Sequence, residues 1–225
     1  MSEVREALRL AALVAAGALV LTGCGSPEQD AGAPVTGVTT HDDDGLHGIL
    51  LPRPYEVSDL ALTATGGTAY RLAADTEKPL TLVFFGYTHC PDICQVVMAD
   101  IASALTRLDE AERAQVGMLF VTTDPARDDE ATLRTYLDRF DPSFEGLTGP
   151  LARIVRAGKS LGVAIEKGEK LPSGGYEVSH GTQVVGMLPD GTAPVVWTQG
   201  TAPEQIAEDI HVVLSEGGVP TGETE

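Results

Sequence analysis

Two cysteines directly after an apolar strand are the feature that most constrains this chain. The apolar run over residues 80–85 indicates a buried strand of a parallel sheet, and Pro91 is typical of the first turn of a helix. The chain therefore turns from strand to helix at Cys90. Cys94 follows four residues later, so both sulfurs share one helix face at a separation that a disulfide can span. The pair can be oxidised together or hold one metal ion, and the helix N-terminus is expected to favour both thiolates.

Strand and helix patterns alternate over the rest of the chain. A hairpin is expected over 57–72. Further strands are expected at 80–85, 116–121, 163–166, 183–188 and 195–198. Helices are expected at 91–108, from 128 to before Pro142, at 150–161 and at 203–214. This order predicts an α/β protein with a thioredoxin-like fold, in which helices flank a central mixed sheet. The N-terminal hairpin would be an extension of that fold. The cysteines would lie at the carboxyl end of a central strand, where open α/β sheets place their sites.

The N-terminus has the pattern of a lipoprotein signal peptide. Two arginines precede an apolar run over 10–21, which is too short to span a membrane. The run ends at Leu21-Thr22-Gly23-Cys24, which resembles a bacterial lipobox, where the cysteine becomes the lipid-modified first residue. An uncleaved anchor is the alternative interpretation. Lipidation of Cys24 would place the protein at the extracytoplasmic face of the bacterial cell membrane and leave Cys90 and Cys94 as one self-contained pair.

Composition suggests where the domain begins and ends. After a signal peptide at 1–23, we expect a flexible tether at 24–54, a folded thioredoxin-like domain at 55–215 and a disordered tail at 216–225, because the tether is rich in Gly, Pro, Asp and Thr and lacks periodicity. His41 and His47 lie in the tether beside three aspartates. Polar linkers produce such clusters by chance, so neither histidine is assigned a role.

Charge excludes one class of partner. The formal net charge is -18, with 15 Lys and Arg against 33 Asp and Glu. Nucleic acids and anionic lipid surfaces are bound through clusters of Lys and Arg, and the sequence contains no such cluster. We therefore expect no nucleic-acid partner.

Three segments resemble the Sco/SenC family of copper-binding assembly proteins over about residues 55–214. They are residues 83–94, the Thr-Asp-Pro-Ala-Arg-Asp loop at 123–128, and His180 before a strand. The resemblance implies that Cys90, Cys94 and His180 bind copper, as Cu(I), Cu(II) or both. It also implies a partner, the copper-site subunit of cytochrome oxidase, whose dinuclear copper centre this family helps to mature.

The chemistry of these three residues is consistent with that implication. Two thiolates select soft Cu(I), and an imidazole completes a three-coordinate site. His180 is expected in a loop that faces the cysteine turn, where thioredoxin-like proteins usually carry a cis-proline. The alternative is a purely structural role, in which His180 packs against the core or caps the start of a strand.

The other candidates have weaker support. Asp124 follows a strand at the same sheet edge and is a candidate to orient a ligand or contact the partner, although Asp before Pro is also a routine turn former. His89 could lower the pKa of the neighbouring thiol, but a tight turn would point it away. Asp92 is interpreted as a helix-capping residue and His211 as structural or solvated.

Two functions therefore stay open. One is a membrane-tethered copper chaperone; the other is a thiol-disulfide oxidoreductase that uses Cys90 and Cys94 as its catalytic redox pair to reduce the cysteines of the oxidase copper site. The four-residue spacing and the missing proline disfavour a general thioredoxin role. The sequence does not separate copper delivery from simple copper buffering.

Overall fold

The computed structural model describes residues 45–170 and 176–219, and for residues 167–170 and 176–180 it describes the backbone alone. The predicted signal peptide, Cys24, His41 and most of the expected tether lie outside these ranges, as does the end of the expected tail from 220. None of the described helices is long and apolar enough to cross a membrane.

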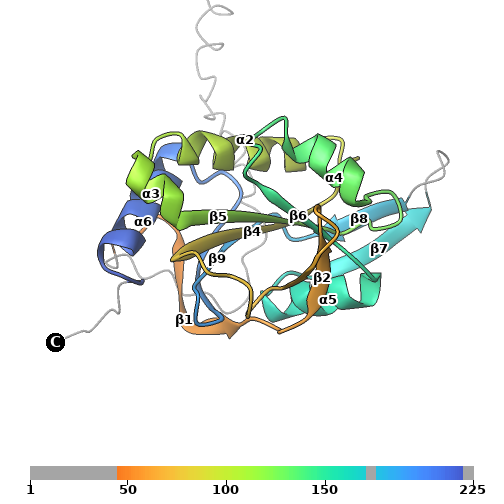
Figure 1. Ribbon diagram of the computed structural model, residues 1–225, viewed down its shortest axis with the longest axis horizontal. Helices are drawn as coiled ribbons and strands as arrows, with labels where there is room; N and C mark the ends of the chain where they lie inside the picture. Colours follow the sequence, from red (N-terminus) through yellow and green to blue (C-terminus); the bar gives the residue numbers. More distant parts are fainter. Residues whose placement is uncertain (1–44, 171–175, 220–225) are drawn as a thin grey trace, which may run out of the picture. The chain divides into compact units, whose positions relative to one another are not determined.

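A mixed sheet of eight strands is the centre of the described fold (Figure 1). In spatial order its strands are β1 (Ile49–Glu56), β10 (Thr192–Trp197), β9 (Val184–Met187), β4 (Leu80–Gly86), β5 (Val116–Thr122), β6 (Glu145–Thr148), β2 (Ala61–Ala64) and β3 (Ala69–Arg71). The β4–β5 and β5–β6 pairs are parallel, and the other pairs are antiparallel. Every residue of β4 is buried, as expected for a strand with a covered sheet on both faces.

Helices cover both faces of this sheet. They are α2 (Ile93–Leu105), α3 (Glu110–Gln115), α4 (Glu130–Leu137), α5 (Leu151–Ser160) and α6 (Pro203–Ser215). Side chains alternate along a strand, so Leu82 and Phe84 join the core formed with α2, α4 and α6, whereas Val83 and Phe85 join the core formed with α5. The predicted thioredoxin-like α/β fold is confirmed, with the hairpin formed by β2 and β3.

The expected tether is wrong at its C-terminal end. Residues 49–54 belong to β1, which pairs antiparallel with β10. Proline cannot donate to a strand ladder, yet Pro52 and Pro54 lie in β1, because β1 is an edge strand and its register shifts between Leu50 and Tyr55. Edge position and irregular pairing both tolerate proline.

A buried carboxylate ties the residues before β1 to the rest of the domain. Asp209 of α6 is completely buried and accepts the backbone N–H groups of His47 (2.8 Å) and Gly48 (2.7 Å). It also accepts the indole N–H of Trp197 at 2.7 Å. The His47 imidazole lies 2.8 Å from the Glu208 carboxylate. His47 is thus packed against α6 and is not part of a free tether.

Two further short elements, α3 and β6, were not predicted, and the first residues of the expected tail belong to the fold. α3 buries none of its residues, and its signal is the capping box between Asp109 and Glu112. β6 has four residues, one of them glycine, which is too little for a period to show. Residues 216–218 cap α6, because the N–H groups of Gly217 and Gly218 bond to carbonyl groups of its last turn.

Candidate metal centre

The two cysteines lie where β4 joins α2. Gly86 ends the strand at a close approach: a Cβ there would lie 2.9 Å from the Phe120 ring. Cys90 and Cys94 are 6% and 0% exposed, and no disulfide joins them. The Cys94 N–H donates to Sγ of Cys90 at 3.4 Å. The structure thus brings the two cysteines together at the strand-to-helix turn, but α2 begins at Ile93, so Cys90 lies before the helix and the predicted common helix face is wrong.

Burial changes the expected protonation of Cys94. Burial raises the pKa of the Cys94 thiol far above its ordinary value, and a hydrogen bond with Cys90 raises it further, while a hydrogen bond to the Tyr87 backbone acts in the opposite direction. The expectation that the helix N-terminus favours the Cys94 thiolate is therefore wrong for the protein without metal. Desolvation of the charged form outweighs the helix dipole. Burial also raises the pKa of Tyr87 to about 12, so its phenol stays neutral.

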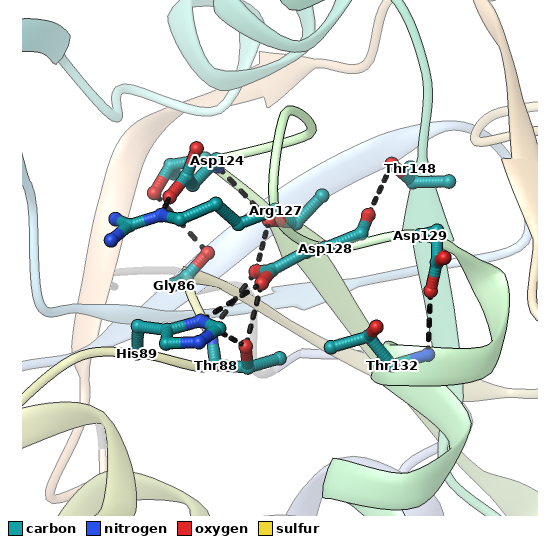
Figure 2. A network of polar contacts seen from close by, with 11 residues as sticks. Gly86, Thr88, His89, Asp124, Arg127, Asp128, Asp129, Thr132 and Thr148 are labelled. Carbon is teal, nitrogen blue, oxygen red and sulfur yellow. Dashed lines mark hydrogen bonds and ion pairs between the residues drawn. The ribbon is translucent and has the colours of Figure 1, made fainter. Parts of the chain in front are cut away.

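Asp128 holds the loop that carries the cysteines (Figure 2). This residue is completely buried, and it accepts the Thr88 backbone N–H at 2.9 Å and the Thr88 hydroxyl at 2.6 Å. The Thr122 hydroxyl donates to it at 2.7 Å, and the His89 imidazole lies 3.7 Å away. Asp128 therefore joins the end of β5 to the segment just before Cys90.

Sequence reasoning did not single out Asp128. It was placed at the start of a helix and in the 123–128 loop that resembles the family, without a role of its own. The N-cap of α4 is instead Asp129, whose side chain accepts the Thr132 N–H at 2.8 Å. The available signal was a pair of adjacent aspartates after a buried strand. One of the two was sufficient to cap the helix, and the sheet edge places the other beside the cysteine loop.

Asp124 has a structural role and one free oxygen. It is completely buried, and one of its oxygens accepts from Arg127 Nε. The other oxygen, Oδ1, has no hydrogen-bond partner among the described residues. The Arg127 guanidinium carbon lies 6.0 Å from the centre of the Tyr87 ring. Asp124 thus fixes an arginine beside the residue that opens the cysteine loop, and its turn-forming role is real, since its carbonyl accepts the N–H groups of Arg127 and Asp128.

His180 ends a strand and does not lie in the expected loop. β7 (Ile165–Lys170) and β8 (Tyr176–His180) form a separate two-stranded sheet in which His180 pairs with Ile165. β9 follows, and its first residue, Val184, pairs with Phe84 near the end of β4. Because β9 runs antiparallel to β4, the chain after His180 enters the sheet at the edge where the cysteine turn lies. The His180 side chain is outside the described set.

The remaining candidates do not join the cysteines as ligands. Asp92 occupies the N-cap position of α2, but its side chain makes no capping hydrogen bond. His89 is 55% exposed in its side chain and bonds to the Thr88 hydroxyl at 3.0 Å. His211 pairs with Glu112 across α6 and α3. The described residues contain no group of three or more His, Cys, Asp or Glu side chains that could hold a metal ion.

Fold and site together define a class: a thioredoxin-like protein with two buried thiols, not joined by a disulfide, at the turn after its central strand. The SCO1/SenC family model matches residues 54–215. The chain therefore belongs to the SCO1/SenC family, and the resemblance drawn from its sequence is confirmed.

Individual relatives agree with this assignment. The mitochondrial SCO2 homolog of Mus musculus is 33% identical over 142 residues, which cover 63% of this chain and 56% of that protein. Bradyrhizobium japonicum ScoI, solved with copper bound, is 32% identical with a TM-score of 0.61, covering 72% of this chain and 98% of the other. The apo Sco1 protein of Thermus thermophilus has a TM-score of 0.67 and is 27% identical, covering 79% and 98%. The match thus spans little more than half of the mitochondrial relative.

Proposed function

We propose that this protein is a copper chaperone, tethered by lipid on Cys24 to the extracytoplasmic face of the cell membrane. It binds copper through Cys90, Cys94 and His180 and helps to assemble the dinuclear copper centre of cytochrome oxidase, whose copper-site subunit is the partner. The observation that carries the proposal is the pair of buried thiols, not joined by a disulfide, at the β4–α2 turn of a SCO1/SenC chain.

The donor set fits copper. Two sulfurs and an imidazole are the ligands that soft Cu(I) prefers, and a buried turn excludes the water that would compete for it. Burial keeps the proton on Cys94 in the absence of metal, so binding must release that proton. Copper uptake is therefore expected to be coupled to loss of a proton from Sγ of Cys94.

The residues around the cysteines support their geometry. Asp128 holds Thr88 on one side of the loop, and Arg127, itself held by Asp124, lies beside Tyr87 on the other. Groups that orient metal ligands contribute to affinity without contacting the ion. We assign Asp124 and Asp128 such positioning roles.

A thiol-disulfide oxidoreductase is the second candidate function. It is supported by one contact: the Cys94 N–H donates to Sγ of Cys90 at 3.4 Å, so the two cysteines adjoin each other at this turn, as a disulfide requires. The same sulfurs serve both functions, and oxidation of the pair would exclude copper.

Copper titration of the reduced protein, followed by mixing with a metal-free fragment that carries the oxidase copper site, tests both functions. A chaperone binds copper and passes it to the fragment. For the oxidoreductase, copper-free reduced protein is mixed with the fragment in its disulfide form; a Cys90–Cys94 disulfide then appears while the fragment disulfide is reduced to two thiols. A protein that binds no copper under reducing conditions refutes the first proposal.

A further inference from the structure

A groove of about 440 Å³ lies between the cysteine turn and α4. Its volume is in the range of ligand sites in proteins. The β4–α2 loop and one side of α4 line it with Thr88, His89, Ala131, Thr132, Thr135, Tyr136 and Arg139. Because His89 directly precedes Cys90, an occupant of this groove lies next to the cysteine turn.

Arg139 is held in position at this groove. Its Nε donates to the Tyr136 carbonyl at 3.3 Å, and its guanidinium carbon lies 4.8 Å from the centre of the Tyr136 ring and 5.9 Å from that of Phe140. A guanidinium stacked on aromatic rings is oriented before a ligand arrives, which lowers the entropic cost of binding.

This guanidinium makes no ion pair with any carboxylate that the structure describes. The nearby acidic residues are engaged elsewhere. Asp138 pairs with Arg134 at 2.8 Å, Asp129 caps α4, and Asp128 is completely buried within its own hydrogen bonds. Arg139 thus has its charge available for a ligand.

The groove also differs in charge from the protein as a whole. None of the described residues that line it is acidic, whereas the chain carries a formal net charge of -18. An acidic segment of another protein is therefore repelled by most of this molecule and attracted here.

We propose that the groove binds a segment of the partner polypeptide, the one whose cysteines react or exchange metal with Cys90 and Cys94. A carboxylate of that segment forms an ion pair with the Arg139 guanidinium. The inference rests on the proposed function, in which a second polypeptide approaches the cysteine turn. Arg139 would set the direction in which that segment lies, and it would favour partners with Asp or Glu close to their cysteines.

Thiol exchange with small peptides tests this inference. Reduced full-length protein is mixed with capped heptapeptides of Gly and Ser whose central cysteine carries a 2-thiopyridyl disulfide. A protein thiolate attacks the peptide sulfur and forms a mixed disulfide, and pyridine-2-thione leaves with the bonding electron pair. The second protein thiolate then releases the peptide thiol, so the dithiol loses two electrons and the peptide disulfide gains them. Each peptide has one Glu at a defined position, and its matched partner has Gln there.

At low ionic strength we expect Glu at one or more positions to increase the rate of thione release about threefold over Gln, the size of one exposed ion pair. Arg139→Gln should bring this ratio to about one. Arg156→Gln removes the same charge from an exposed position of α5, on the other face of the sheet, and should keep the ratio.

A ratio near one at every position in the wild type overturns the inference, and so does a preference that survives Arg139→Gln or that falls equally in Arg156→Gln. Copper titration of the wild type involves neither the peptides nor Arg139. Failure of the groove and failure of the proposed function are therefore distinguishable.

Discussion

Asp128 accepts both the backbone N–H and the hydroxyl of Thr88, a residue that precedes it by 40 positions. These two hydrogen bonds attach the loop before Cys90 to the segment that follows β5. The contact joins two segments that each contain one part of the site. It also makes a buried carboxylate responsible for the conformation of the segment just before Cys90.

Asp128→Asn is expected to lower the free energy of unfolding by about 2 kcal/mol, since the side chain accepts three hydrogen bonds and an amide NH₂ would face donors where a carboxylate oxygen now accepts. Urea unfolding of the reduced protein measures this loss. The matched control is Asp129→Asn, where asparagine is about as good a helix N-cap as aspartate. Equal stability of the two variants would show that Asp128 does not anchor the loop.

The raised pKa of Cys94 predicts a pH dependence of stability. The native thiol keeps its proton at pH values where the unfolded thiol, with its ordinary pKa near 9, loses it. The contribution of the Cys94 thiol to the free energy of unfolding is therefore complete below about pH 9. It is lost as the pH rises from there toward the native pKa, with a limiting slope of about 1.4 kcal/mol per pH unit. Unfolding of reduced wild type and Cys94→Ala at pH 8 and pH 10 measures it. The stability difference between them should shrink at pH 10, and a constant difference contradicts the assignment.

His180→Ala separates the two proposed functions. Thiol exchange needs only the two sulfurs, so it should be retained, whereas loss of one of three ligands should weaken copper binding by at least about tenfold. Competition with a chelator of known strength measures the affinity. His211→Ala is the control, because His211 is an exposed histidine of α6 that pairs with Glu112. Equal copper affinity in wild type and His180→Ala would support the oxidoreductase.

Cys24→Ala tests the anchor. The variant should keep the thermal unfolding midpoint of the domain, because Cys24 precedes every residue of the described fold, but it should leave the membrane fraction. Fractionation and N-terminal sequencing measure the result. Membrane retention with unchanged processing would refute the lipoprotein interpretation.

Local patterns were sufficient to predict much of this protein. The apolar run of β4, Pro91 and the spacing of Cys90 and Cys94 predicted a dithiol at a strand-to-helix turn, because each signal involves residues that are neighbours in the chain. The Gly191 turn between β9 and β10 was predictable for the same reason. The resemblance to the family rests on these local segments as well.

Only the tertiary structure decided the rest. That Pro52 and Pro54 lie in a strand depends on β1 being at an edge, and the high pKa of Cys94 depends on the core packed around it. The roles of Asp128 and Asp209 come from contacts between distant segments, which no local period encodes. A sequence determines which residues are next to each other along the chain, whereas burial and long-range contacts exist only once the sheet has assembled.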